Sequence, residues 1–231
     1  MNKTIIVTDL TRFNTNGRVC LAGVEPETRM LIRPMPYINQ DFCEENKIIP
    51  GSIISADFDP VPTRTPPHIE DYWWRNIVKA GNATSSEFYE LLRATAFPSI
   101  ATGFEMAVTD KVIPPAAPPK KSIITINARV KLHPGYSGDL QKIRASITDN
   151  DGLTLSYLPI ADLGFYRFAQ KLRMRNELQK LGDFIDNQNE IYVRLGLSRY
   201  HKAADGREGY WIQVNGIYTF PDFCAELRSY E

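Results

Sequence analysis

A proline-rich segment, IPPAAPPKKS at residues 113–122, divides this sequence into two blocks of short β-rich segments. Proline has no backbone N–H to donate, so such a run is excluded from a central strand and favours an extended connector of about 3.1 Å per residue. A chain of 231 residues can form one large domain or two of about a hundred residues each. We therefore predict two domains, residues 1–112 and residues 113–231.

The first block is predicted to contain short strands separated by turns. Apolar and β-branched residues gather in four segments, residues 4–7, 19–24, 29–33 and 52–58. Turn-forming residues occupy positions 14–17 and 25–28. Pro34 is expected to end the third strand because it cannot donate to a ladder. Short antiparallel strands that follow one another are typical of a small barrel or sandwich.

A helical insert is predicted near residues 68–100. Its first helix is expected at about residues 69–79 and includes YWW at 72–74, whose rings we expect to divide between the core and a surface. The second helix begins at a capping box, in which Thr84 is the N-cap and Glu87 follows three residues later. Just before the insert, HIED at 68–71 places a histidine near two acids, as a hydrolytic site would, but short polar runs before helices are typical of capping.

The second block repeats the pattern of strands and adds a basic helix. Strands are expected at residues 123–132, 142–148 and 153–158, with DNDG at 149–152 as a hairpin turn. A helix is predicted at residues 164–181 and is expected to end at Gly182. Residues 165–180 hold five basic side chains and one acidic one. A basic face of this helix is formed by Arg167, Lys171 and Arg175.

The second block closes with a long hairpin. Its two strands, IYVRLGLSRY and YWIQVNGIYTF, flank the polar loop HKAADGREG. Alternation places Ile191, Val193, Leu195, Leu197, Ile212 and Val214 on a core side. The other side carries Tyr192, Arg194, Trp211, Gln213 and Asn215. Aromatic rings, amides and a guanidinium are the groups that stack on bases and hydrogen-bond to them. We therefore predict that this outward face binds a ligand.

Charge and composition exclude several classes of protein. The formal net charge is zero, which argues against a protein that coats DNA through charge alone. Residues 1–112 hold 11 basic and 14 acidic side chains and residues 113–231 hold 16 and 13, a difference from −3 to +3 that points to the second block as the one meeting an anion. The short apolar start MNKTIIVTDL is unlike a signal peptide, and no apolar run would span a membrane. We expect a cytoplasmic protein.

The spacing of cysteine and histidine predicts neither a disulfide framework nor a metal site. Cys20, Cys43 and Cys224 are odd in number and far apart, so we expect reduced and mostly packed thiols. The three histidines are equally scattered, without the helical i, i+4 spacing of a metal pair. No cofactor is predicted.

Several segments resemble the bacterial dual OB-fold (DuOB) domain family. They are VCLAGVEPETRMLIRPM in the first block and KIRASITDNDGLTLSYLPIADLGF, YVRLGLSRY and YWIQVNGIY in the second. The resemblance runs from Ile5 to Phe220 without the insert at 68–100, and Tyr200 stands where the family pattern has proline. It implies a mainly β chain with a few helices, built from two small OB-like barrels in tandem, and a nucleic-acid-binding role connected with defence or DNA and RNA metabolism.

The leading hypothesis is a non-catalytic module that binds single-stranded nucleic acid. Arg194, Arg199 and the basic helix face would contact phosphates, Trp211 and Tyr192 would stack on bases, and Gln213 and Asn215 would read base edges or a 2′-hydroxyl. Whether the ligand is DNA, RNA or a nucleotide stays open.

Three alternatives remain. A sensor or adaptor would hold a nucleotide between the two barrels, with Arg29 and Arg33 on one wall and Arg199 on the other. A protein-interaction module is a further alternative. An enzyme is disfavoured, because the sequence has no P-loop, no GxGxxG and no GxSxG motif.

Overall fold

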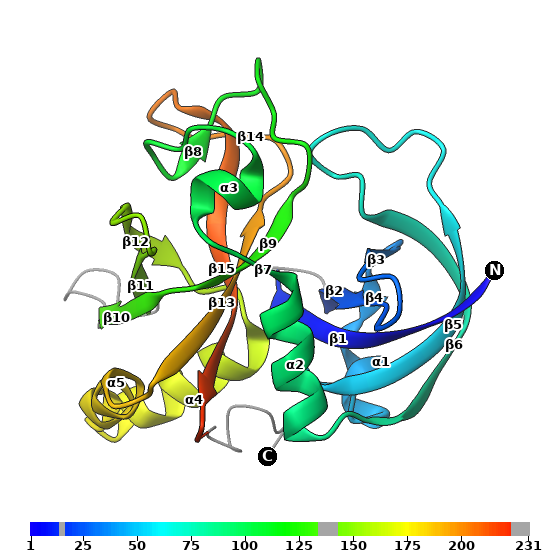
Figure 1. Ribbon diagram of the computed structural model, residues 1–231, viewed down its shortest axis with the longest axis horizontal. Coiled ribbons are helices and arrows are strands. Elements are labelled where there is room, and N and C mark those ends of the chain that lie inside the picture. The colour runs from blue at the N-terminus through cyan, green and yellow to red at the C-terminus, as the bar shows by residue number, and fades with distance from the viewer. Residues whose placement is uncertain (14–16, 134–142, 223–231) are drawn as a thin grey trace.

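The first block of the chain forms a closed ring of strands. The computed structural model describes residues 1–13, 17–133 and 143–222 (Figure 1). The elements of the first block are β1 (Asn2–Arg12), β2 (Arg18–Val24), β3 (Leu31–Met35), β4 (Ile38–Asn39), α1 (Gln40–Glu45), β5 (Ser52–Pro60) and β6 (Asp71–Asn82). The order β1-β5-β6-β3-β2 returns to β1, because β1 also pairs with β2. Alternate residues of β5, among them Ile54, Ala56 and Phe58, point into the core of this ring.

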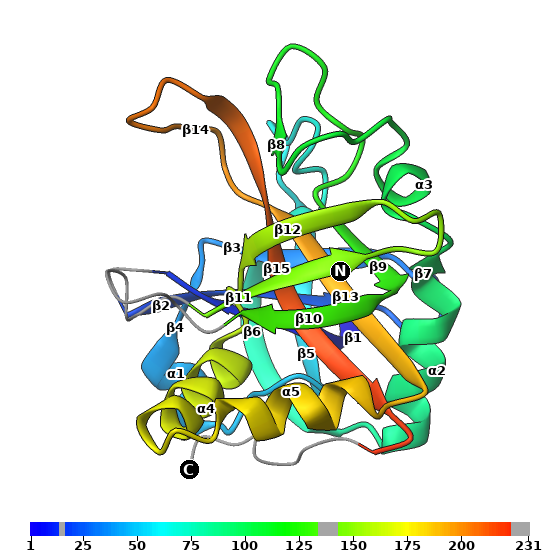
Figure 2. The same cartoon turned by 90° about the vertical axis from the view of Figure 1, so that its left-hand side faces the viewer.

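In the part of the chain that the structure describes, the second block consists of two sheets and four helices. Its elements are α2 (Ser85–Thr95), β7 (Ala96–Phe97), α3 (Ile100–Phe104), β8 (Val112–Ile113), β9 (Ile123–Asn127), β10 (Arg129–His133), β11 (Arg144–Thr148), β12 (Thr154–Pro159), α4 (Leu163–Met174), α5 (Leu178–Asp186), β13 (Glu190–Leu197), β14 (His201–Lys202) and β15 (Glu208–Phe220). One sheet has the order β14-β15-β13-β9-β7, with β8 on β15, and the other the order β10-β11-β12. Figure 2 shows the three-stranded sheet as a layer in front of β13 and β15.

The prediction of a mainly β chain with a few helices is confirmed. The tandem arrangement of two OB-like barrels stays a prediction. The strands of the first block close a ring. In the second block, the chain runs directly from β9 in one sheet to β10 in the other, and the isolated bridge Ile160–Val214 also joins the region of β12 to β15. Apolar side chains from both of these sheets meet in one core, which contains Ile126, Ile147 and Val214.

The change from one block to the other lies upstream of the proline-rich segment. β7 pairs with β9 and β8 pairs with β15, and Ile100, Phe104 and Val108 belong to the core of the second block. Residues 96–113 therefore pack with the second block, although the sequence places the boundary at residue 113. Helix α2 lies at the junction, where Phe88, Leu91 and Leu92 form a cluster with residues of both blocks.

Two predictions in the first block were wrong. Residues 71–82 form β6 instead of the predicted helix over 69–79, because their aromatic and β-branched side chains favour a strand that pairs along β5 and with β3. Tyr72 is buried and Trp73 is 51% exposed, as the division of YWW between core and surface predicts. Pro34 does not end β3. Beyond Ile32 this strand pairs with β6 on one edge and, among the described strands, has no partner on the other, so no ladder hydrogen bond requires the N–H that Pro34 lacks.

The capping box and the DNDG turn are confirmed. Thr84 caps α2 and exchanges hydrogen bonds with Glu87, and Gly152, with φ of +86°, lies in the turn between β11 and β12. The predicted helix over residues 164–181 is divided in two, because Asn176 adopts a left-handed conformation (φ +57°) that ends α4. Gly182 lies inside α5. The predicted turn residues 14–16, Lys142 and Cys224 lie outside the described residues.

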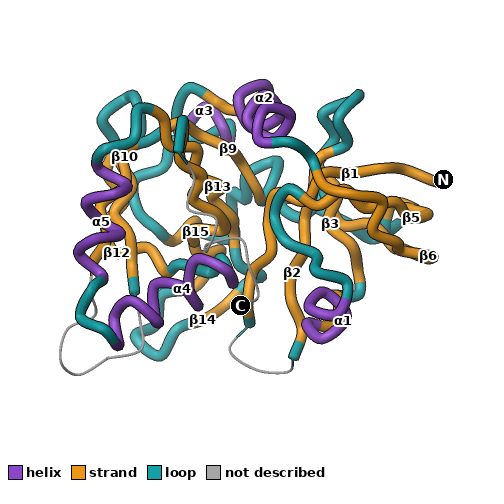
Figure 3. The backbone as a smooth tube through the Cα atoms, turned by 90° about the horizontal axis from the view of Figure 1, so that it is seen from below, coloured by secondary structure: helices purple, strands orange, loops and turns teal. Residues whose placement is uncertain are grey.

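Helices α4 and α5 follow one another along the second block, and α1 lies beside the first (Figure 3). Arg167 on α4 reaches Glu44 on α1 at 2.6 Å, so this basic residue ties the two blocks together.

Candidate nucleic-acid interface

The hairpin face that the sequence predicts as a binding surface is buried between the two blocks. Tyr192, Arg194 and Asn215 are only 2 to 3% exposed. Tyr192 packs in the junction cluster with Phe88 of α2, and Tyr218 donates its hydroxyl to the carbonyl of Thr8 in β1 at 2.6 Å. The expectation that this face points outward is therefore wrong, since its aromatic and polar groups hold the first block and α2.

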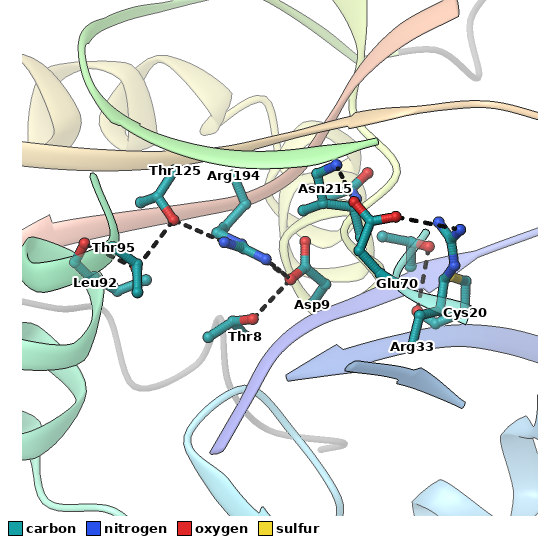
Figure 4. A network of polar contacts seen from close by, with 12 residues as sticks. Thr8, Asp9, Cys20, Arg33, Glu70, Leu92, Thr95, Thr125, Arg194 and Asn215 are labelled. Carbon is teal, nitrogen blue, oxygen red and sulfur yellow. Dashed lines mark hydrogen bonds and ion pairs between the residues drawn. The ribbon is translucent and has the colours of Figure 1, made fainter. Parts of the chain in front are cut away.

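Arg194 is the centre of this junction (Figure 4). Its Nε and Nη2 atoms lie 2.9 and 2.6 Å from Asp9 Oδ2, and its Nη1 donates to the Thr125 hydroxyl at 2.7 Å. Asp9 is fully buried and also accepts from Thr8. The charge of Arg194 is thus met by a carboxylate of the first block.

The amide of Asn215 is also engaged in packing. An added Cβ on Gly196 would lie 2.2 Å from Asn215 Nδ2, so glycine is needed opposite this side chain. Gln213 donates to Asn215 Oδ1 at 3.1 Å. Trp211 is half-buried and lies under the guanidinium of Arg207, 4.9 Å from the ring centroid. The amide of Asn215 is thus buried, and the half-buried amide of Gln213 is bound to it.

A second buried network surrounds Arg33, which is 3% exposed. Its Nε donates to Asp71 at 2.6 Å, its Nη1 to Ser122 at 3.0 Å, and its Nη2 to Nδ1 of His68 at 3.0 Å. Burial alone would lower the pKa of Arg33, but the surrounding negative charge outweighs it and raises this pKa. Arg33 therefore acts as a permanent structural cation.

The acidic residues of HIED connect the two blocks. Glu70 accepts from the backbone amides of Ser122 and Ile123 at 2.6 and 3.2 Å, at the start of β9. Burial raises the pKa of Glu70, although Arg33 and Ser122 act in the opposite direction. Asp71 accepts from Arg199 at 2.8 Å. The predicted helix cap is therefore absent, and these carboxylates instead bind backbone amides and guanidinium groups.

His68 makes the Arg33 network sensitive to acid. Burial, reinforced by the charges of Arg33 and Arg199, lowers the pKa of His68 to about 3. In the unfolded chain this pKa is about 6.5, so between these values a proton binds the unfolded state and stability falls as the pH falls. His68→Asn keeps an acceptor for Arg33 but removes the titrating group. When the pH falls from 7 to 4.5, we expect its free energy of unfolding, measured by urea denaturation, to fall by about 1 to 2 kcal/mol less than that of the wild type. Equal losses in both proteins would contradict the prediction.

Of the remaining predicted site residues, only Arg199 meets another one among the described contacts, because it shares Asp71 with Arg33. Arg29 is exposed in the turn before β3, and Arg199 is paired with Asp71. Lys171 and Arg175 are exposed on and just after α4, whose Arg167 is bound to Glu44. The predicted composite of hairpin and basic helix is therefore not one surface.

A different basic surface lies on the three-stranded sheet. Alternate residues of β10, β11 and β12 point away from the core, and we call this surface the outer sheet face: Arg129, Lys131, His133, Arg144, Ser146, Thr148, Thr154, Ser156 and Tyr157. The residues between them, including Val130, Ile147 and Leu158, are buried. The three strands contain three cations and no acidic residue, so their positive charge is not neutralised within the sheet.

Two rings lie side by side on the outer sheet face. Tyr157 is 45% exposed, and its ring centroid lies 4.4 Å from that of His133 with a tilt of 35°. The Nε2 atom of His133 is 2.7 Å from the Ser146 hydroxyl. Tyr157 has φ of +58°, a rare conformation for a large side chain, at an irregular point of the β11–β12 pairing. Burial and the charge of Lys131 lower the pKa of His133, so the ring is neutral at pH 7.

The sequence contains a signal for the outer sheet face that differs from the one in the hairpin. The segments RVKLH, RASIT and TLSYLP alternate apolar residues with basic or hydroxyl-bearing ones and lack carboxylates. These strands are short, whereas the longer and more aromatic strands β13 and β15 dominate the pattern of the second block. The sequence pattern therefore predicts a binding face on the hairpin and not on the three-stranded sheet.

The cysteines of the described residues are packed in the interior. Cys20 and Cys43 are free and buried, as predicted. Burial raises the pKa of Cys20, and that of Cys43 to about 12, so both thiols are protonated at pH 7. Within residues 1–13, 17–133 and 143–222, no group of three His, Cys, Asp or Glu side chains could hold a metal ion. In the same residues, no helix has the length and apolar character needed to cross a membrane.

Comparison with known proteins identifies no family for this chain. No family model and no curated protein matches the sequence. Among solved structures, the p204 HINb domain is similar with 13% identity and a TM-score of 0.37, over 93% of this chain and 96% of that one. The Ifi202 HINa domain, crystallised in complex with 20bp dsDNA, is similar with 11% identity and a TM-score of 0.36 over the same shares. A murine DNA binding protein bound with ds DNA has 11% identity and a TM-score of 0.31, over 93% of this chain and 92% of that one. TM-scores this low do not establish a shared fold, and the resemblance to the dual OB-fold family stays a prediction.

Proposed function

We propose that this protein binds single-stranded nucleic acid across the outer sheet face. The observation that carries the proposal is the combination of three cations, the exposed ring of Tyr157 beside the half-buried ring of His133, and several hydroxyl groups on one sheet whose strands hold no carboxylate. The net charge of zero applies to the whole chain, whereas phosphates respond to the local field of such a surface. A single ligand strand could meet cations and rings together.

The geometry favours a single strand over a duplex. Arg129 and Lys131 are two residues apart on β10, about 7 Å along the strand, and Arg144 lies opposite His133 on β11. Arg144 also donates to the carbonyl of Tyr157 at 3.4 Å, and Lys131 lies near enough to His133 to lower its pKa, so two of the cations lie beside the ring pair. A base can stack on Tyr157 only when its own π-face is free, which is the case in an unpaired strand and not inside a duplex.

The cations are expected to supply the salt-dependent part of the affinity. We expect the variant Arg129→Gln/Lys131→Gln/Arg144→Gln to bind fluorescein-labelled oligo(dT) or oligo(U) more weakly in an anisotropy titration. The log–log dependence of affinity on salt should become flatter by about 0.7 for each phosphate that the variant no longer neutralises. The matched control, Lys171→Gln/Arg175→Gln/Lys180→Gln, removes the same charge from the helices. An equal loss in both variants would show a general charge effect and would exclude the outer sheet face as the site.

The ring of Tyr157 is expected to supply a part of the binding affinity that does not depend on salt. Tyr157→Asn removes the ring, and asparagine tolerates the left-handed backbone at this position. We expect a loss of about 1 to 3 kcal/mol of binding free energy at every salt concentration. In a competition experiment, an unlabelled duplex should displace the labelled single strand poorly from the wild-type protein. Full affinity in folded Tyr157→Asn, or absence of wild-type binding at low salt, would contradict the proposal.

A further inference from the structure

A cavity of about 550 Å³ lies between the two blocks, on the side of the molecule where α2 passes into β7. The turn before β3 and the segment 64–72 contribute one wall, and α2, β7 and β9 contribute the other. We call it the interblock cavity. Its volume is in the range of small-molecule sites, about 300 to 1,000 Å³. The outer sheet face is formed by other residues, so the cavity is separate from the proposed nucleic-acid surface.

The positive charge of the interblock cavity is only partly neutralised. Arg194 is paired with Asp9, and Lys121 reaches Glu105 at 3.2 Å. Arg29 and Arg64 also line the cavity, and neither has an ion-pair partner among the described side chains. Two guanidinium charges therefore face a space whose only lining acid, Glu70, already accepts three hydrogen bonds.

The structure orders the guanidinium group of Arg64 and the backbone of Arg29. Arg64 lies over the ring of Tyr72 at 4.8 Å, and its Nη1 is buried without a hydrogen-bond partner. Arg29 has φ of +61°, within a turn closed by the bonds Arg29 N–Glu25 O and Glu25 N–Met30 O. This turn holds two acids: Glu25, which is bound to Lys3 at 2.9 Å, and Glu27, which is exposed and forms no ion pair with Arg29 among the described residues. An unpaired buried donor and a left-handed arginine are both costly, which is typical of a ligand site.

The rest of the lining is apolar and includes aromatic rings. Leu31, Ile123 and Ile124 contribute aliphatic surface, and Phe97 contributes a ring with the amine of Lys121 4.5 Å from its centroid. The hydroxyls of Thr95 and Thr125 lie 3.4 Å apart at the wall beside Arg194 (Figure 4). A fitting ligand thus needs a planar, largely apolar body, polar edges, and a doubly charged anionic group.

We propose that the interblock cavity binds a nucleoside monophosphate. Its phosphate carries a charge of about −1.5 to −2 at pH 7, which matches the two unpaired guanidinium groups, and its base fits the apolar wall. Bidentate contacts from Arg29 and Arg64 would hold the phosphate. Because residues of both blocks form the cavity, the ligand also stabilises their contact.

The test is isothermal titration calorimetry with adenosine 5′-monophosphate, guanosine 5′-monophosphate, adenosine and inorganic phosphate. We expect at least one of the two nucleotides to bind, and to bind about tenfold or more tightly than adenosine or phosphate. Arg29→Gly, which suits the left-handed turn, and Arg64→Gln should each weaken that binding about tenfold or more. Arg93→Gln, an exposed arginine of α2 paired with Glu90, is the matched control and should bind normally.

Circular dichroism melting of the unliganded variants checks that they stay folded. Equal affinity for nucleoside and nucleotide, unchanged binding in folded Arg29→Gly/Arg64→Gln, or no binding of either nucleotide at millimolar concentration would overturn the proposal. Oligonucleotide binding by Arg29→Gly/Arg64→Gln reports on the outer sheet face separately, so the two proposals can fail independently.

Discussion

Replacing Arg194 with alanine is expected to lower the free energy of unfolding by about 3 to 5 kcal/mol. Asp9 of β1 would stay buried but would lose both of the hydrogen bonds that it accepts from the guanidinium of Arg194 on β13. A buried carboxylate without a counter-charge is among the most destabilising single defects. Urea denaturation followed by circular dichroism measures the loss.

The double variant Asp9→Ala/Arg194→Ala separates an ion pair from simple packing. Removing both partners leaves no isolated charge, so its loss should be smaller than the sum of the two single losses. Arg93→Ala, which breaks the exposed pair with Glu90 and a distant contact with the Tyr89 ring at 5.9 Å, should leave the urea midpoint nearly unchanged. Additive single losses would show that Arg194 and Asp9 do not act as a pair.

Replacing Arg33 with methionine is expected to have a similar effect, about 3 to 5 kcal/mol. Methionine preserves much of the apolar stem but leaves Asp71 with only the half-exposed Arg199 and removes the donors to Ser122 and His68. Glu70 also loses Arg33 as an ion-pair partner at 3.9 Å. The measurement is again urea denaturation at pH 7.

A second substitution, which neutralises the charge of Asp71, tests whether the unpaired carboxylate causes this loss of stability. Asp71→Asn in the Arg33→Met background should recover part of the loss, because the unpaired carboxylate is removed. Arg199→Ala should cost less than about 1 kcal/mol, since this arginine is 41% exposed and its pairing is screened by water. A loss in Arg33→Met that Asp71→Asn deepens would mean that Arg33 acts through packing alone.

The burial of the predicted binding face has one physical cause. Period-two alternation shows that Tyr192, Arg194 and Asn215 share one side of the hairpin, and the structure agrees with that pattern. Alternation does not show what covers a side. Here Phe88 of α2 and Asp9 of β1 cover it, and these residues lie about a hundred or more positions away in the chain.

Local chemistry in the sequence was sufficient for the elements that depend on neighbours in the chain. The capping box of Thr84 and Glu87 starts α2, and the DNDG turn joins β11 to β12. Runs of apolar and β-branched residues mark β2 and β5, and apolar alternation marks β13. Each depends on backbone and side-chain groups a few residues apart, so the sequence alone predicts it.

Tertiary structure decided the rest. Residues 71–82 became a strand because β5 and β3 offer pairing edges on either side of them. Arg194 became a buried structural cation because Asp9, 185 residues away, supplies the opposite charge, while Arg129, Lys131 and Arg144 remained on a surface because no acidic residue lies within their sheet. An arginine has the same chemistry in all these places, and only the distance to a carboxylate and to water determines whether it holds the fold together or is available to bind phosphate.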